Sequence, residues 1–445
     1  MPLKVIVVGA GLGGLATTIA LTRAGHDVEV FERSSFTYEV GAAINLAPNA
    51  TRVLTALGCD LEAMAPVRCE HLSIWNKQGE FVATAAVSVA MSKPNCELRI
   101  KQSKVTEKLQ KQLGFDDEWL LVHRVDIHNA LRKTAEAGFS GRKPKIYLSC
   151  GVTSVDPING KVVLSDGRQL QADLVIGADG VHSRTVHAVA DEPHKKIGTG
   201  QNCYRFLVPT AKLQSSLLAK SLVERIGLKG VNAFRSQTEK IIIYPCRSGA
   251  LINSGVFLPT SDDEEIGESS WLNSGQHSDL VAAVKSYSPE LREFCRLGED
   301  VKLWSLATRD PPQSFFKEKL ALIGDAAHPM LPHQGQGGAQ AFEDAAALGA
   351  LLTADTTREQ VTERLRMYND VRYEHAVTVM FLSRVGDELQ EVVMDDLRRF
   401  VPNAKMPEDM FRYAWASYPT QDAERILASS SNRQRPLGGY AGERQ

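Results

Sequence analysis

The chain has 445 residues, and its 51 basic and 53 acidic side chains give a formal net charge of −2. This balance removes the electrostatic basis for nucleic-acid binding, and the length exceeds what one hydrophobic core usually serves, so two domains are expected. Seven scattered cysteines without a Cys-x-x-Cys pair indicate free thiols in a reducing, cytoplasmic compartment and argue against a disulfide framework or a zinc site.

The first elements form a predicted βαβ unit. Residues 3–8 are an apolar strand, residues 9–14 read Gly-Ala-Gly-Leu-Gly-Gly, residues 15–24 have helical character, and residues 28–31 form a second strand. The uncharged run 5–22 has a length near that of a membrane span, but its four clustered glycines favour a turn between a strand and a helix. We therefore predict a parallel sheet and no integral membrane segment.

The glycine turn has the pattern of a dinucleotide-binding loop. Gly9, Gly11 and Gly14 satisfy G-x-G-x-x-G between a strand and a helix, and Glu32 closes the second strand eighteen residues after Gly14. An acidic side chain at that place can accept hydrogen bonds from an adenosine ribose. Arg33 follows it and is grouped with the same site. Glycine-rich turns also serve plain packing, and this motif alone does not separate NAD from FAD.

The middle of the chain changes character near residue 187. Helical periodicity occurs near 49–57, 125–135 and 343–352, whereas 187–298 reads mainly as strands separated by polar turns. We predict a discontinuous cofactor domain at 1–186 and 299–395 and a mainly β substrate domain at 187–298, which some strands near 68–105 join. C-terminal helices are predicted at 396–428 and a disordered tail at 429–445.

A second signal lies at residues 172–184. An apolar strand runs into the turn Asp179-Gly180, and Arg184 follows shortly after it. The alternative is an ordinary strand end, because Asp-Gly is a common turn pair.

A third and more informative signal lies at residues 321–345. A short apolar strand ends at Asp325, a Pro/Gly-rich loop follows, and a helix opens on Gly337 and Gly338. Loop glycines let backbone N–H groups approach a ligand, and a helix start favours negative charge. The arrangement predicts a cradle suited to a flavin, which needs a carboxylate for ribityl hydroxyls, backbone groups for its pyrimidine edge and a positive pole for the reduced ring.

Together these three segments resemble the single-component FAD-dependent aromatic hydroxylases, especially the salicylate hydroxylase-like branch that includes fungal secondary-metabolite monooxygenases. Segments 41–50 and 123–128 are similar to further elements of that family, and the resemblance spans most of residues 3–385. Ala43 departs from the pattern, since relatives often have glycine there. The resemblance implies an α/β fold: a Rossmann-like FAD-binding domain of the para-hydroxybenzoate hydroxylase type with an inserted, mainly β substrate domain.

The resemblance also implies cofactor contacts. It gives Glu32 the ribose, Arg124 a flavin-side contact and Asp325 the ribityl and diphosphate region, and it places the loop 332–338 at the reactive ring edge. It places Asp179 in an element shared between FAD and a passing nicotinamide cofactor. The full expected cofactor-binding set is Gly9, Gly11, Gly14, Glu32, Arg33, Ala43, Arg124, Asp179, Asp325, Gly337 and Gly338. No second G-x-G-x-x-G motif occurs, which fits transient docking of NADPH or NADH, and the sequence does not decide between them.

The implied chemistry is aromatic hydroxylation. NAD(P)H reduces FAD, oxygen adds to it, and the resulting C4a-hydroperoxide passes a hydroxyl group to an electron-rich ring, for which a phenolate is the better nucleophile. Arg205 is the first catalytic candidate, as a fixed cation for a phenolate or carboxylate; a surface-paired strand arginine is the alternative. The fungal branch pairs such an arginine with a tyrosine from a later strand. Tyr244 is the nearest candidate, and a core aromatic is its alternative.

Two histidines in the cradle loop, His328 and His333, invite a proton-transfer role because histidine titrates near neutral pH. The alternative is that they only hydrogen-bond the backbone of a tight loop. The leading hypothesis is a cytoplasmic FAD-dependent monooxygenase, monomeric or homodimeric, that hydroxylates a small phenolic or aromatic-acid substrate with molecular oxygen. The alternatives are a flavin epoxidase acting on an alkene and a non-catalytic flavin-binding protein.

Overall fold

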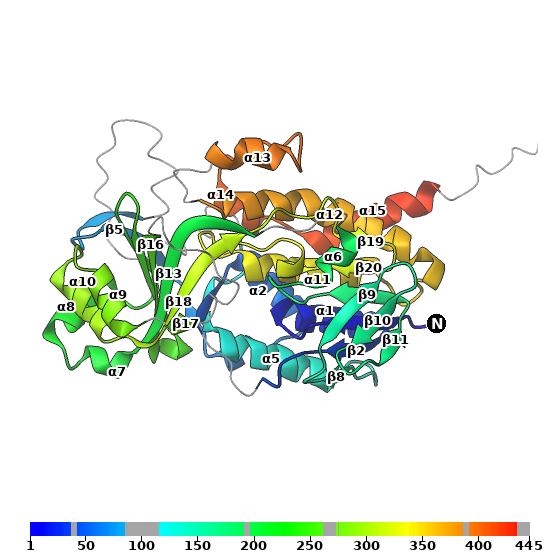
Figure 1. The fold of residues 1–445 in the computed structure, drawn as a ribbon, viewed down its shortest axis with the longest axis horizontal. Helices are drawn as coiled ribbons and strands as arrows, with labels where there is room; N and C mark the ends of the chain where they lie inside the picture. The colour runs from blue at the N-terminus through cyan, green and yellow to red at the C-terminus, as the bar shows by residue number, and fades with distance from the viewer. Residues whose placement is uncertain are drawn as a thin grey trace, which may run out of the picture.

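The computed structural model describes residues 1–36, 42–84, 115–190, 196–260, 273–274, 276–385 and 391–433. Two large sheets divide the molecule (Figure 1). The first has six strands in the order β19 (Phe316–Lys317), β20 (Leu320–Leu322), β12 (Leu174–Gly177), β1 (Lys4–Val8), β2 (Asp27–Phe31) and β8 (Lys145–Tyr147). All its pairings are parallel except β19 with β20.

The first sheet forms because its central strands are apolar on both faces, as strands covered by helices on each side must be. In β1, the four residues after Lys4 are all buried, and so is the whole of β12. The helices α1 (Leu12–Arg23) and α11 (Gly337–Leu351) pack against each other so closely that a Cβ on Gly349 would lie 2.9 Å from the Ala20 side chain.

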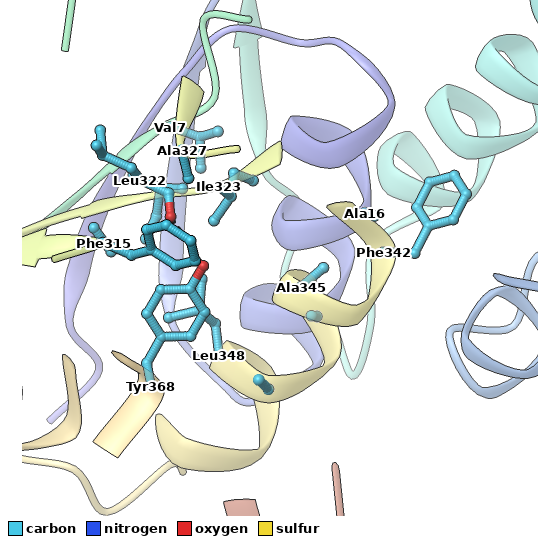
Figure 2. Close-up of a cluster of buried hydrophobic side chains, with 14 of the residues drawn as sticks. Val7, Ala16, Phe315, Leu322, Ile323, Ala327, Phe342, Ala345, Leu348 and Tyr368 are labelled. Atoms are coloured by element: carbon cyan, nitrogen blue, oxygen red, sulfur yellow. Dashed lines mark hydrogen bonds between the residues drawn. The ribbon is translucent and has the colours of Figure 1, made fainter. Parts of the chain in front are cut away.

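The core beneath this sheet is shown in Figure 2. Phe315, Leu322 and Leu348 pack there with Tyr368 of α12 (Val361–Leu382), whose hydroxyl donates to the Leu322 carbonyl at 2.9 Å. The hydrogen bond satisfies the one polar group of a fully buried tyrosine, and it ties α12 to the strand that leads into the loop after residue 322.

The second sheet has eight strands in the order β17 (Asn273–Ser274), β18 (Glu299–Thr308), β13 (Ile197–Pro209), β16 (Leu251–Pro259), β15 (Lys240–Cys246), β14 (Gly230–Arg235), β5 (His71–Asn76) and β6 (Phe81–Thr84). Residues 71–84 therefore supply two strands to it, while 85–105 lie outside the described residues. Figure 1 shows helices gathered at this end of the molecule: α7 (Thr210–Leu213), α8 (Leu217–Ile226), α9 (His277–Ala283) and α10 (Pro289–Arg296).

Those helices were not expected from the sequence, which suggested mainly strands for this region. The sequence features that start these helices are local. At the start of α8, the Ser216 side chain accepts from the Ala219 N–H. At the start of α10, the Ser288 side chain accepts from the Leu291 N–H, and Pro289 follows the serine. A serine cap with proline at the first helical position is typical of a helix start. The helices bury their apolar faces against one side of the sheet and leave the other side for the site.

Smaller elements connect the two sheets. A three-stranded sheet has β7 (Leu120–His123) between β3 (Ala43–Leu46) and β4 (Val67–Arg68). The remaining elements are α2 (Pro48–Ala56), η1 (Glu62–Met64), α5 (Arg124–Ala137), β9 (Val152–Asp156), β10 (Lys161–Leu164), β11 (Gln169–Gln171), α6 (Val186–Val189), η2 (Arg247–Gly249), η4 (Gly324–Ala326), η5 (Arg358–Gln360), α13 (Met394–Arg398), α14 (Met410–Trp415) and α15 (Pro419–Arg433).

Helix α15 corrects one boundary from the sequence. Residues 429–433, assigned there to a disordered tail, continue the helix because apolar residues such as Ala423 pack it against the first core. Residues 434–445 lie outside the described residues. None of the helices in the described ranges has the length and apolar character that crossing a membrane requires.

Candidate active site

A single cavity of about 1230 Å³ runs between the two sheets. One end is lined by Gly9, Gly11, Glu32 and Arg33, and the other end by residues of β13, β15, β16 and β18. The cavity therefore brings most of the predicted cofactor residues together with both predicted catalytic residues, although Gly9 and Asp325 are more than three hundred positions apart in the chain.

The three glycines of the G-x-G-x-x-G motif have different physical roles. Gly9 has φ +102°, and a Cβ there would lie 2.5 Å from the Ala178 carbonyl oxygen. A Cβ on Gly14 would lie 2.1 Å from the Gly9 carbonyl oxygen, so Gly14 is required by the packing of the turn and does not line the cavity. A Cβ on Gly11 would meet nothing within 4 Å, and Gly11 lines the cavity. Gly11 is thus the place where a ligand can approach bare backbone.

Glu32 is held at the same end of the cavity. One carboxylate oxygen accepts from the Ala10 N–H at 2.7 Å and the other from the Ser34 N–H at 2.7 Å. These bonds fix the carboxylate beside the glycine turn, with further acceptor capacity on both oxygens.

The segment 172–184 ends in a turn that is held by hydrogen bonds within itself. Asp179 accepts from the Ser183 and Thr185 hydroxyls and from the N–H groups of Arg184 and Thr185, at 2.6 to 3.1 Å. Asp179 and Arg184 both line the cavity, but the Asp179 carboxylate is largely occupied in holding its own turn. The strand β12 running into an Asp-Gly turn is confirmed.

Asp325 lies on η4, which follows β20, and it lines the cavity. Burial within the fold raises the pKa of its carboxyl, and nearby His328, Arg309 and Arg124 oppose that rise. Arg124 lines the cavity too. Arg309, which the sequence analysis missed, is buried, and its Nε and Nη1 have no hydrogen-bond partner among the described residues, while Nη2 donates to the Asp325 and Ala326 carbonyls.

The helix α11 begins at Gly337, as predicted, but neither Gly337 nor Gly338 is among the residues that line the cavity. A Cβ on Gly337 would lie 4.0 Å from Asp325 Oδ1, and one on Gly338 would lie 2.9 Å from the Ile44 side chain. These glycines let the helix start pack closely behind the cavity wall.

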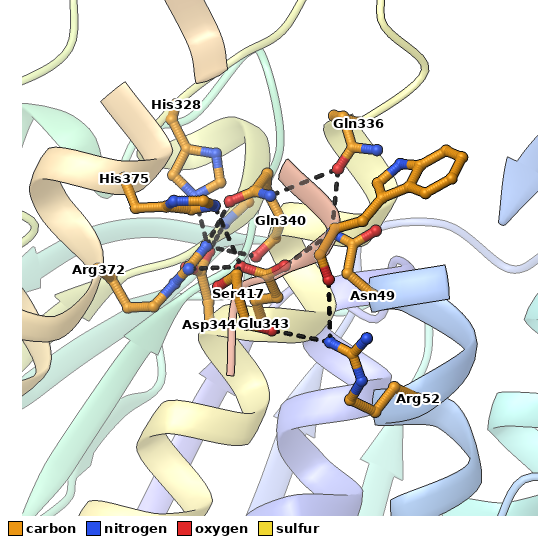
Figure 3. Close-up of polar contacts among 12 residues, drawn as sticks. Asn49, Arg52, His328, Gln336, Gln340, Glu343, Asp344, Arg372, His375 and Ser417 are labelled. Atoms are coloured by element: carbon orange, nitrogen blue, oxygen red, sulfur yellow. Dashed lines mark hydrogen bonds and ion pairs between the residues drawn. The ribbon is translucent and has the colours of Figure 1, made fainter. Parts of the chain in front are cut away.

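A buried polar network supports this loop from behind (Figure 3). Asp344 accepts from the Gly324 N–H at 2.9 Å and pairs with His328 Nε2 at 2.7 Å. Arg372 lies between Asp344 and Glu343, with Nε to Asp344 Oδ1 at 2.8 Å and Nη1 to Glu343 Oε2 at 2.6 Å. All four charged or titratable side chains are almost completely buried. The network fixes the loop after β20 to α11 and α12.

His328 is therefore part of this support and does not line the cavity. His333 is not among the lining residues either. Its Nδ1 lies 2.5 Å from Lys240 Nζ. Burial, with the positive charges of Lys240 and Arg235, lowers the pKa of His333 to about 3, so the neutral ring accepts the hydrogen bond from Lys240 at neutral pH.

At the other end of the cavity, three side chains of the second sheet meet the backbone of one residue, Ala43. Arg205 Nη2 and the Tyr244 hydroxyl donate to the Ala43 carbonyl at 3.1 and 2.9 Å, and Asn253 Oδ1 accepts from the Ala43 N–H at 3.0 Å. Arg205 and Tyr244 are therefore brought together at this residue, and Tyr244 also packs against a cluster of buried apolar side chains. The sequence did not single out Asn253; its signal is an asparagine, followed by Ser254, inside a mostly apolar strand.

Apolar side chains complete this end. Burial raises the pKa of Tyr244 to about 12, with the Arg205 charge acting against that rise. Cys203, Ile242, Phe257 and Trp304 line the surrounding walls, and the Arg205 guanidinium lies 5.9 Å from the Trp304 ring centroid. A protonated phenol group and a guanidinium thus face a mostly apolar compartment.

These features define a flavoprotein site in physical terms. The cavity is large enough for a dinucleotide and a small ring, and it is lined by the residues Glu32 and Asp325 and by the bare backbone of Gly11. The guanidinium of Arg309, whose Nε and Nη1 have no partner among the described residues, adds positive charge near the Asp325 and Asp179 carboxylates. The residues present fit FAD.

A family model described as FAD binding domain matches residues 2–383, and the chain belongs to this family. It is 31% identical over 91% of its length to FAD-dependent monooxygenase cfoG of Aspergillus candidus, covering 90% of that protein, and 32% identical over 84% of its length to hispidin-3-hydroxylase of Neonothopanus nambi, covering 86% of it. The protein is accordingly an FAD-dependent monooxygenase.

Solved structures confirm the predicted fold. A salicylate hydroxylase substrate complex matches with a TM-score of 0.73 and 21% identity, covering 95% of this chain and 97% of that one. The structure of CtdE in complex with FAD and substrate 4 matches with the same TM-score and 19% identity, covering 97% and 99%. The mixed α/β architecture of the para-hydroxybenzoate hydroxylase type is therefore established for this chain.

Proposed function

We propose that the enzyme hydroxylates a small phenol or aromatic acid, and that Arg205 and Tyr244 hold the substrate's oxyanion. The observation that carries the proposal is the convergence of both donors at one point of an apolar compartment, beside the Ala43 peptide. Two relatives are consistent with that substrate class by name: hispidin-3-hydroxylase, and the 3-hydroxybenzoate 6-hydroxylase of Klebsiella oxytoca.

 The latter relative is 26% identical over 86% of this chain.

The proposed cofactor contacts follow the cavity. Glu32 accepts the ribose hydroxyls, with Arg33 beside it, and the bare backbone at Gly11 receives the diphosphate. Asp325 and Arg124, which line the cavity, hold the ribityl chain and the flavin ring, and Ala42 borders the reactive edge. NADH or NADPH is the proposed transient electron donor.

The net reaction is balanced by one reductant and one oxygen molecule. Substrate C–H, O₂, NAD(P)H and a proton give substrate C–OH, NAD(P)⁺ and water. Bound FAD supplies the redox chemistry and delivers the oxygen atom. The chain's own residues bind, orient and polarise the ring.

Arg205 and Tyr244 act on the substrate's charge. The guanidinium stays positive and stabilises a phenolate, which is a better nucleophile than the neutral phenol. The Tyr244 hydroxyl has a raised pKa, so it stays protonated, and on substrate binding it transfers its one hydrogen bond from the Ala43 carbonyl to the same oxygen. Phe257 and Trp304 limit the access of water to this pair.

The test measures NAD(P)H oxidation against a panel of phenols, with labelled oxygen and product mass. We expect incorporation of one oxygen atom, and a loss of about 10²-fold or more in kcat/KM for Arg205→Gln, with activity moved to higher pH because the bound phenol ionises less readily. Tyr244→Phe is expected to lose less. Tyr204→Phe is the matched control, since Tyr204 packs into the core on the other face of the same sheet.

Two outcomes contradict the proposal. NAD(P)H oxidation that no aromatic compound stimulates would favour a non-catalytic role for the substrate compartment. Turnover of an alkene at a rate independent of phenol ionisation would favour epoxidation.

A further inference from the structure

An ion pair joins the helix that follows β7 to the hairpin that carries Tyr244. Arg247 Nε donates to Asp126 Oδ2 at 2.8 Å, and its Nη2 donates to Asp126 Oδ1 at 2.9 Å. Asp126 lies in the first turn of α5, and Arg247 begins the short turn η2 between β15 and β16. The bidentate geometry fixes the orientation of the two groups as well as their distance.

The backbone at this joint is strained. Arg247 and Ser248 have φ of +49° and +51°, and Ala65, whose carbonyl accepts from the Ser248 N–H at 2.8 Å, has φ of +47°. Non-glycine residues in the left-handed region are uncommon, and they persist where surrounding contacts impose them, often at ligand clamps. Three of them meet here, at the contact between the hairpin and the segment that precedes β4.

The joint closes a ring of contacts around the active-site peptide. The Arg124 N–H donates to the Ala42 carbonyl at 2.9 Å, and Asp126 follows two residues later. Tyr244 donates to the neighbouring Ala43 carbonyl, and Arg247 follows it by three residues on the same hairpin. The backbone of Ala42 and Ala43 is thus held from both sides, and the Asp126–Arg247 pair is a contact that joins the two sides.

We propose that Asp126 and Arg247 are positioning residues that hold Tyr244 at the Ala43 peptide and so set the placement of the bound phenol. The inference rests on the proposed role of Tyr244 and Arg205. The Arg247 side chain is 40% exposed, and ion pairs of that exposure contribute little to stability, so placement is the property that the pair controls.

The first test follows the ring itself in the holoenzyme. Hydrogen exchange of the amides at 42–46 is measured in Asp126→Asn, in Arg247→Lys, which loses the planar fork, and in the double reversal Asp126→Arg with Arg247→Asp. Arg142→Gln is the matched control, since its ion pair with Asp27 at 2.6 Å has a similarly exposed guanidinium. We expect exchange several-fold faster in the two single variants only, with partial recovery in the double reversal.

The second test follows the substrate oxygen. The absorbance of 4-nitrophenol bound to the oxidised holoenzyme gives its ionised fraction at a fixed pH, and product formed per NAD(P)H consumed gives the coupling. Both are expected to fall in the single variants by up to about tenfold, because small displacements near the reacting atoms are costly, and to recover in part in the double reversal.

The outcomes separate this inference from the proposed function. If wild-type enzyme leaves the ionisation of 4-nitrophenol unshifted and Arg205→Gln changes nothing, the phenolate role is wrong, while exchange at 42–46 still decides whether the pair holds the peptide. If wild type shifts the probe and Arg205→Gln abolishes the shift, but both single variants match Arg142→Gln in exchange, spectrum and coupling, the positioning role is wrong.

Discussion

Replacement of Arg372 by methionine tests how the cofactor loop is supported. The guanidinium is 1% exposed and contacts Glu343 Oε2 at 2.6 Å, Asp344 Oδ1 at 2.8 Å and Gln340 Oε1 at 2.7 Å. In Arg372→Met, two adjacent buried carboxylates lose their common cation. Breaking a buried pair in this way costs about 3–5 kcal/mol, a large part of the roughly 5–15 kcal/mol by which a native protein is stable.

Arg372→Met is also expected to weaken the binding of FAD. Asp344 also accepts from the Gly324 N–H and pairs with His328, so its displacement loosens the loop that carries Asp325. Urea unfolding of the holoenzyme, followed by circular dichroism and by flavin fluorescence, gives the loss of stability and shows whether FAD leaves at a lower urea concentration.

Two further variants test whether the loss of stability in Arg372→Met is electrostatic. Arg366→Met removes an exposed arginine from the same helix and is expected to change stability by less than about 0.5 kcal/mol. Combining Arg372→Met with Glu343→Gln and Asp344→Asn removes the buried charges and is expected to recover part of the loss. A loss below about 1 kcal/mol in Arg372→Met, or no recovery in the neutral triple variant, would refute the electrostatic reasoning.

Three predictions concern acid stability and the glycines. Burial raises the pKa of Asp344, but His328 and Arg372 outweigh this effect and lower it to about 2. The contribution of Asp344 to stability is therefore present above the pKa of the unfolded state, near 4, and is lost as the pH falls from there toward 2. Asp344→Asn should flatten that part of an acid-unfolding curve. Gly11→Ala should leave the melting temperature unchanged and raise the Kd for FAD by about tenfold, whereas Gly14→Ala should lower the melting temperature, because its Cβ meets backbone at 2.1 Å. Gly255→Ala adds a methyl group to the cavity wall, 3.2 Å from a Phe257 ring carbon, and should raise KM several-fold for bulky phenols more than for small ones in steady-state assays.

The sequence predicts the parts of the site that depend on neighbouring residues. The turn after β1, the Asp-Gly turn after β12 and the loop before α11 each combine a strand, a turn and a helix within about twenty residues. Their backbone geometry follows from glycine placement and hydrophobic periodicity, and the structure has each element at its predicted place within a few residues.

The substrate end depends on strand register, which periodicity does not supply. Arg205 pairs with Gly255 and Tyr244 pairs with Asn253, and only this register aims all three polar side chains at Ala43. The sequence does not predict the Arg372 network either, because the network joins helices that only tertiary packing brings together. The helices α8 and α10 had local cap signals that were outweighed by the strand character of their surroundings.

The structure also explains why alanine serves at position 43, where the family resemblance led us to expect glycine. Ala43 is not among the described residues with positive φ, so its backbone does not require glycine. Its contacts with Arg205, Tyr244 and Asn253 all use the peptide N–H and C=O, and none uses the side chain. The substitution therefore leaves the held peptide unchanged. The site requires a fixed backbone at position 43, and the side chains of Arg205, Tyr244 and Asn253 supply the contacts that fix it.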